Sequence, residues 1–166
     1  MNHARLHSPL GDILLHFDDD VLWGLYFDGQ KHQPAAIAQA KRDDAHPVAR
    51  ATDAWLERYF AGEPMEATLP LHLQGTPFQQ KVWAALLRIE YGRTATYRSM
   101  AHEAGSPAAV RAVGAAVGRN PVSIIVPCHR VLGSDGSLTG YAGGLSRKTH
   151  LLTLEGVLPP GLPGIR

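Results

Sequence analysis

The segment Pro127-Cys128-His129-Arg130 holds the only cysteine of the chain and follows the apolar run Ile124 to Val126. Such a short apolar run predicts a buried strand. Proline has a fixed φ and no backbone N–H, so Pro127 would end that strand. A fold of this chain must therefore bury residues 124–126 and hold the thiol at the end of a rigid element.

A lone cysteine in an arbitrary chain is most often a small buried hydrophobe. Here His129 follows Cys128 directly, which places a titratable base close to the sulfur, although adjacent side chains need not face each other. A neighbouring base or cation lowers the pKa of a thiol and makes it a nucleophile. The setting favours a reactive cysteine.

Length and composition bound the remaining possibilities. A chain of 166 residues suits one domain, or two small domains that share an interface. No apolar run approaches the roughly 20 residues that cross a membrane, and residues 1–11 lack the apolar core of a signal peptide. One cysteine excludes an internal disulfide and any zinc site with two thiolates. We expect no metal, no membrane partner and a cytoplasmic location.

Charge is distributed unevenly along the chain. Residues 1–72 hold six Lys/Arg and eleven Asp/Glu, whereas residues 73–166 hold ten and four. Ordinary surface variation is one explanation. A nucleic-acid-binding second half is the other.

The first half reads as a small sheet with one helix. Residues 3–27 alternate apolar and polar positions, which predicts an antiparallel hairpin or meander. A loop with a short helix around Ile37 should follow, then a helix over 48–60 and a short strand over 68–73. We expect no catalytic chemistry from this half.

The second half opens with a helix signature. Thr76 and Gln79 form a capping box around Pro77, and the helix that they start should end near residues 90–92. A helix over 96–105 and another over 107–117 should follow, joined by a turn at Gly105. Two helices joined in this way are typical of a helix-turn-helix.

The helix over 107–117 carries Arg111 on a face of small residues that includes Ala112. Such a face allows close approach to a neighbouring helix or to a nucleic-acid groove, and both readings stay open.

Farther on, Gly133 to Gly136 is a turn-rich hairpin signal, and a last helix is expected over 145–155. A buried Glu155 at the end of that helix would need a partner. His129 is the candidate, which gives a Cys-His-Glu relay.

These motifs resemble those of the O6-alkylguanine-DNA alkyltransferases. The resemblance is dense over residues 75–156 and rests on Pro127 to Arg130, Arg111 to Gly114, Asn120-Pro121, Gly140 to Gly144, and Leu151 to Glu155. It implies an α/β fold with a small ribonuclease H-like N-terminal domain over 1–74 and a mostly helical, winged-helix-like domain over 75–156. Residues 157–166 would form a loose tail.

The resemblance also implies a role for each matching residue. Cys128 would accept the alkyl group, with His129 as the base that deprotonates it through a water and Glu155 as the carboxylate that holds the histidine. Asn120 would order the active-site turn, and Tyr97 would protonate the leaving guanine and rotate the nucleotide. Arg111, beside Ala112, would fill the gap in the base stack, and Ser134 would contact a phosphate. The substrate pocket would be formed by Val131, Tyr141 and Ala142.

The implied activity is stoichiometric DNA repair. The alkyl group of O6-alkylguanine, and also of O4-alkylthymine, would pass irreversibly to Cys128 without a cofactor. The implied partner is double-stranded DNA bound through its minor groove with the damaged nucleotide flipped out, and a monomer is expected. Two alternatives remain at this point: a DNA damage sensor or winged-helix regulator without transfer, and a thiol hydrolase that uses Cys-His-Glu on a small molecule or peptide.

Overall fold

The N-terminal strands form a four-stranded sheet in the order β3-β2-β1-β4. The strands β1 (Asn2–Leu6), β2 (Ile13–Phe17) and β3 (Leu22–Phe27) make the predicted antiparallel meander. The short strand β4 (Lys41–Arg42) pairs with β1 in parallel, after the 3-10 helix η1 (Ala35–Gln39), which confirms the short helix expected around Ile37. The computed structural model describes residues 1–160; the expected loose tail over 157–166 lies, from residue 161 on, outside the described residues.

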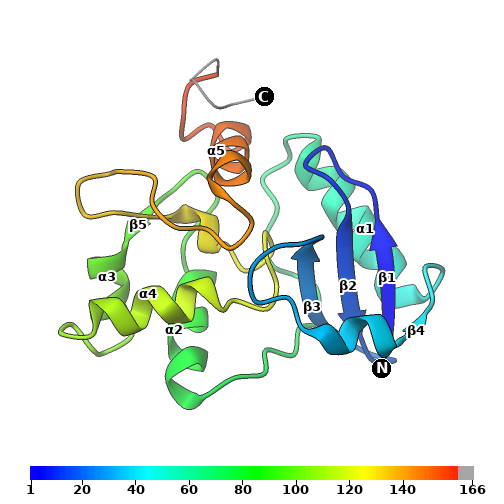
Figure 1. Ribbon diagram of the computed structural model, residues 1–166. Helices are drawn as coiled ribbons and strands as arrows, with labels where there is room; N and C mark the ends of the chain where they lie inside the picture. The colour runs from blue at the N-terminus through cyan, green and yellow to red at the C-terminus, as the bar shows by residue number, and fades with distance from the viewer. Residues whose placement is uncertain (161–166) are drawn as a thin grey trace.

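Helix α1 (Pro47–Phe60) packs against β2 and confirms the helix expected over 48–60 (Figure 1). The strand expected over 68–73 is wrong, because only a single bridge joins Leu71 to Leu22. Leu22 donates its N–H to the carbonyl of Pro70 and accepts from His72 N–H, but Pro70 has no N–H with which to extend the ladder.

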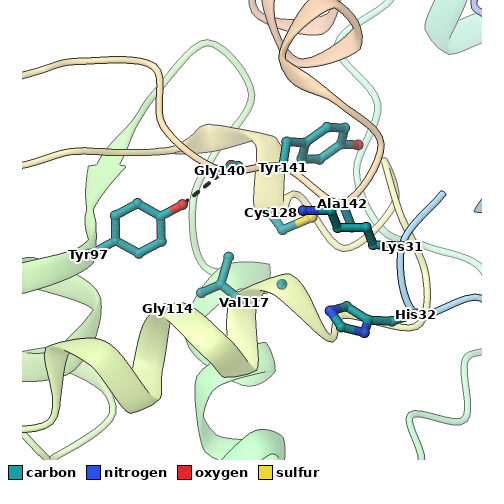
Figure 2. Close-up of a pocket in the computed structure, with 10 residues that line it drawn as sticks. Lys31, His32, Tyr97, Gly114, Val117, Cys128, Gly140, Tyr141 and Ala142 are labelled. Carbon is teal, nitrogen blue, oxygen red and sulfur yellow. Dashed lines mark hydrogen bonds between the residues drawn. The ribbon is translucent and has the colours of Figure 1, made fainter.

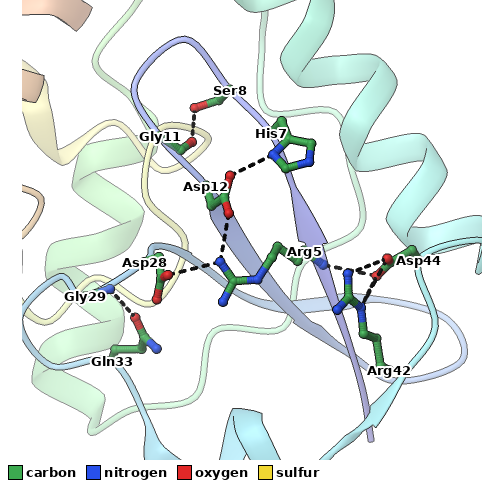
Figure 3. A network of polar contacts seen from close by, with 10 residues as sticks. All are labelled: Arg5, His7, Ser8, Gly11, Asp12, Asp28, Gly29, Gln33, Arg42 and Asp44. Carbon is green, nitrogen blue, oxygen red and sulfur yellow. Dashed lines mark hydrogen bonds and ion pairs between the residues drawn. The ribbon is translucent and has the colours of Figure 1, made fainter.

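A network of ion pairs covers the exposed side of this sheet (Figure 3). Arg5 Nη1 lies 2.9 Å from Asp12 Oδ2 and 3.0 Å from Asp28 Oδ2. Next to Asp28, the backbone N–H of Gly29 donates to Gln33 Oε1 at 3.1 Å. These contacts fix both ends of the loop between β3 and η1, which carries Lys31 and His32.

Helix α2 (Pro77–Leu87) begins at the predicted capping box, with Thr76 Oγ1 accepting from Gln79 N–H and Gln79 Oε1 accepting from Thr76 N–H. It ends three residues earlier than expected. Arg88 and Ile89 donate to the carbonyls three residues before them, so the last turn tightens and closes the helix at Leu87.

Helices α3 (Tyr97–Glu103) and α4 (Val110–Gly118) pack against each other and against α2. The start expected at Pro107 is wrong by three residues. Ala109 N–H donates to Ser106 carbonyl at 2.9 Å, which closes a turn with Pro107 at its second position. Proline favours that turn position as much as a helix start, which explains the difference.

A two-stranded parallel sheet joins β5 (Ala95–Thr96) to β6 (Val131–Leu132), and helix α5 (Leu145–Leu154) ends the described fold. Residues 133–136 form a turn, as expected, but no strand between that turn and residue 160 pairs with β6, so the hairpin reading is wrong. A sheet-and-helix first half beside a largely helical second half confirms the expected α/β class (Figure 1). No helix within residues 1–160 is long and apolar enough to span a membrane.

Candidate active site

The segment that leads to Cys128 is a buried turn and not the expected strand. Ile124, Ile125 and Val126 are all buried, as the apolar run predicted. Their backbone, however, closes on itself: Val126 N–H donates to the carbonyl of Val122 at 3.0 Å, and Ile124 has a φ of 72°. Hydrophobicity therefore predicted burial correctly and conformation wrongly.

Asn120 imposes this turn. Its Nδ2 donates to the carbonyl of Val126 at 2.8 Å, while its Oδ1 accepts from Val122 N–H at 3.0 Å. The side chain is 4 % exposed and so replaces the backbone pairing that a strand would have supplied. The N-terminal sheet holds the segment from the other side, because Leu25 of β3 exchanges backbone hydrogen bonds with Pro121 and Ser123.

Cys128 and His129 begin the 3-10 helix η2 (Cys128–Arg130) directly after this turn. His129 Nε2 lies 2.6 Å from Glu155 Oε2, and both side chains are fully buried. Glu155 is the C-terminal cap of α5, so two segments far apart in the sequence meet here. The structure thus brings the predicted histidine and carboxylate together.

The charge state of Glu155 fixes the tautomer of His129. Burial alone would raise the pKa of Glu155, but hydrogen bonds from His129 and Arg130, together with the Arg130 charge, lower it to about 2. An ionised carboxylate only accepts hydrogen bonds, so the Nε2 of His129 must carry the proton. Burial lowers the pKa of His129, which favours the neutral ring. Its Nδ1 is then a buried acceptor without a hydrogen-bond partner in residues 1–160.

Burial raises the pKa of the Cys128 thiol, and Asn120 and the Lys148 cation only partly offset that effect. Lys148 is itself buried, and its Nζ donates to the carbonyls of Val131, Thr139 and Gly140 at 2.5, 3.0 and 3.2 Å. Burial lowers the pKa of Lys148 to about 8. The free protein therefore keeps the thiol protonated, with a neutral base and a buried cation nearby.

A pocket of about 150 Å³ opens over Cys128 (Figure 2). Helix α4 forms one side through Gly114, Val117 and Gly118, and the loop from Gly140 to Ala142 forms the other. Tyr97 lies at one edge, where its hydroxyl donates to the carbonyl of Thr139 at 3.1 Å. Lys31 and His32 from the N-terminal loop line the opposite edge in Figure 2.

The other sequence-predicted residues lie around this pocket. Tyr97, Tyr141 and Ala142 line it directly, and Val131 is buried, with its carbonyl bonded to Lys148. Arg111 and Ala112 are exposed on α4, the helix that supplies Gly114 and Val117 to the pocket wall. Ser134 is exposed in the turn after β6 and does not line the pocket.

Sequence reasoning missed several residues that the structure brings to this site. Arg130 and Tyr59 both contact Glu155. Lys31 and His32 line the pocket, and the buried Lys148 donates to the carbonyl of Gly140 in its wall. Lys148 could have been found, because it lies on the same helical face as Leu151, Leu152 and Glu155, and a cation on an apolar face signals a buried charge. Tyr59 occupies an apolar position of its helix, where an aromatic residue is ordinary, so the sequence did not indicate its contact with Glu155. Residues 1–160 contain no group of three or more His, Cys, Asp or Glu placed to hold a metal ion.

Comparisons with known proteins cover both halves of the chain. Residues 77–157 match the family model for the DNA binding domain of 6-O-methylguanine DNA methyltransferase, and residues 1–73 match the model for its ribonuclease-like domain. The methylated-DNA–protein-cysteine methyltransferase of Mycobacterium leprae is 46 % identical over 156 residues, which cover 93 % of each chain. That of Haemophilus influenzae is 45 % identical over 149 residues, which cover 89 % of this chain and 82 % of the relative.

Solved structures show the same likeness. The crystal structure of Mycobacterium tuberculosis OGT in complex with DNA matches with a TM-score of 0.85 at 43 % identity, covering 93 % of this chain and 92 % of that one. The M. tuberculosis O6-methylguanine methyltransferase matches with a TM-score of 0.84 at 43 % identity, covering 97 % and 96 %. This chain therefore belongs to the methylated-DNA–protein-cysteine methyltransferases, the O6-alkylguanine-DNA alkyltransferase family that its motifs resemble.

Proposed function

We propose that this protein repairs DNA by transferring the alkyl group of O6-alkylguanine directly to Sγ of Cys128. The observation that carries the proposal is the position of Cys128 at a pocket, with the His129–Glu155 pair buried beside it. The sulfur attacks the alkyl carbon, a C–S bond forms and the bond from that carbon to O6 breaks. The thiol proton passes through a water molecule to His129 Nδ1, and guanine takes up one proton as it leaves, so the exchange balances.

The site is suited to a reaction that ends after one turnover. The product is a thioether, which has no good leaving group, so the alkylated protein does not return to its starting state. The acceptor belongs to the protein, and the reaction requires no cofactor. O4-alkylthymine presents the same exocyclic alkyl ether and is proposed as a second substrate.

DNA is proposed to approach along α4 with its minor groove. Arg111 and Ala112 are exposed on this helix, and Gly114 and Gly118 of the same helix line the pocket. A base inside the duplex stack cannot reach a thiol that is 5 % exposed, so the damaged nucleotide has to leave the stack. In this proposal Arg111 fills the gap and the hydroxyl of Tyr97 protonates the leaving guanine.

The remaining assignments follow from this arrangement. We assign pocket roles to Val131, Tyr141 and Ala142, the ordering of the turn to Asn120, and a phosphate contact to Ser134. The relay and the pocket are built from residues of one chain, which supports a monomer. We place the boundary between a supporting N-terminal domain and a C-terminal domain that carries out the transfer near residue 74. A free reactive thiol suits a reducing compartment such as the cytoplasm.

Intact mass tests the proposal. Incubation with a duplex that contains one O6-methylguanine should add one methyl group to the protein, and Cys128→Ser should abolish the gain while still binding the duplex. The reaction should stop at one methyl group per protein molecule. Tight binding to the modified duplex without any mass gain would instead support a damage sensor, and neither gain nor binding would leave a thiol hydrolase as the next function to test.

A further inference from the structure

Tyr59 reaches the relay from the N-terminal half of the chain. It lies in the last turn of α1 and is fully buried. Its hydroxyl donates to Glu155 Oε2 at 2.6 Å, across 96 residues of sequence. The same Oε2 is the atom that accepts from His129 Nε2. One carboxylate oxygen therefore joins the N-terminal domain to the base beside the nucleophile.

The direction of this hydrogen bond is fixed by charge. Burial first, and then the adjacent Glu155 carboxylate, raise the pKa of Tyr59 far above its usual range. The hydroxyl therefore keeps its proton and remains a donor to an ionised oxygen. Hydrogen bonds of this charge-assisted kind are short and roughly twice as strong as neutral ones.

Aromatic packing holds the hydroxyl in place. The ring of Tyr59 stacks on Trp55 with centroids 5.5 Å apart, and the ring of Tyr91 meets it edge-on at 6.3 Å. Trp55 is itself tied by its Nε1, which donates to the carbonyl of Glu66 at 2.8 Å. A ring fixed in this way has little freedom to turn its hydroxyl away from Glu155.

Arg130 does not make this contact redundant. Its Nε lies 2.7 Å from Glu155 Oε1, whereas its Nη2 lies 3.2 Å from Oε2. Guanidinium and carboxylate groups favour a symmetric pair with two parallel hydrogen bonds. Without the Tyr59 hydroxyl as a further donor at Oε2, Arg130 would draw that oxygen toward itself and away from the imidazole.

We propose that Tyr59 is a positioning residue of the alkyl transfer, which holds Oε2 of Glu155 against Nε2 of His129. The proposal rests on the function proposed above and extends it. The N-terminal domain thereby takes part in activating Cys128 and does more than support the second domain. Loss of the hydroxyl weakens the support of the imidazolium that forms when His129 takes the thiol proton.

The test is Tyr59→Phe, which removes only the hydroxyl. The matched control is Tyr26→Phe, at a buried tyrosine of the same domain on β3. Alkylation of Cys128 by iodoacetamide is followed against pH in the free protein, and methyl transfer from the modified duplex is followed in parallel. In Tyr59→Phe both rates should fall about tenfold near neutral pH, the size expected for one hydrogen bond to a charged group.

The pH profile separates positioning from mere structural support. In Tyr59→Phe the alkylation profile should move to higher pH and rejoin that of the wild type where the thiol ionises unaided. Tyr26→Phe should leave the profile in place. A folded Tyr59→Phe variant with an unmoved profile would overturn the proposal, even if its melting temperature fell.

Two further measurements keep the test decisive. The iodoacetamide profile needs no DNA, so it tests Tyr59 even where the wild type fails to take up a methyl group and the proposed function falls. If Tyr59→Phe does not fold, proton NMR of the wild type answers the same question. A strongly hydrogen-bonded Tyr59 hydroxyl should give a downfield resonance that Glu155→Gln removes, and its absence from the wild type would refute the contact.

Discussion

Arg130, two residues after the nucleophile Cys128, forms a buried ion pair with Glu155. Its Nε lies 2.7 Å from Oε1 and its Nη2 lies 3.2 Å from Oε2. Arg130 Nη1 also donates to the carbonyl of Ile89 at 2.6 Å, which anchors the guanidinium. The pair keeps the carboxylate ionised beside His129 although both side chains are buried. An isolated buried charge would be very costly, so Arg130 is a condition for the relay to exist.

Glu155→Gln should raise the pKa of the Cys128 thiol. The amide keeps the size of the side chain but removes the negative charge that supports an imidazolium at His129. Alkylation by iodoacetamide should slow about tenfold or more near neutral pH. Glu90→Gln, at an exposed position, is the control and should leave the rate unchanged. An unshifted thiol titration in Glu155→Gln would count against the relay.

Glu155 should also make the free energy of unfolding depend on pH in the acid range. Its pKa falls from 4.5 to about 2 on folding. A depressed carboxyl pKa stabilises the fold fully above the unfolded value, and this contribution is lost as the pH falls from about 4.5 toward 2. Urea unfolding of the wild type should therefore weaken across that window more steeply than that of Glu155→Gln. Parallel curves for the two proteins would exclude this contribution.

Arg111→Ala should affect duplex DNA far more than a free substrate. If Arg111 fills the gap left by the flipped nucleotide, its loss removes about 1–3 kcal/mol from duplex repair. Methyl transfer from the duplex should fall about 5- to 150-fold, while reaction with a free O6-alkylguanine base stays unchanged. Arg58→Ala, on the N-terminal domain, is the control. Equal losses on both substrates would refute the role in flipping.

Asn120→Ala should destabilise the turn before Cys128. The substitution leaves the Val126 carbonyl and the Val122 N–H without their side-chain partners in a buried segment. The Val126 carbonyl still accepts from Cys128 N–H, but the Val122 N–H is left unsatisfied, so a loss of about 1–3 kcal/mol is expected in urea unfolding. Asn2→Ala, at the only other asparagine, should change stability little. A loss below about 1 kcal/mol would show that the turn holds without Asn120.

Local patterns predicted local structure well. The capping box at Thr76 and Gln79 gave the start of α2, and apolar spacing gave α1 and α5 nearly to the residue. Two of the errors share one cause. Pro107 and the run from Ile124 to Val126 each suit two conformations, and the choice between them was made by hydrogen bonds to Ser106 and Asn120. Such bonds are specific to the fold and have no periodic pattern.

The motif residues and their order along the chain determined the family of the protein and the side chains available for its chemistry. Cys128, its neighbouring base, the distant carboxylate and the helix pair are all present in the sequence, because catalytic chemistry requires particular side chains at particular places. The tertiary structure alone decided how those groups are charged and held. Arg130 faces Glu155, Lys148 lies buried near the thiol, and Tyr59 arrives from the other domain. These contacts depend on burial and on segments brought together by packing, and no spacing along the chain encodes them.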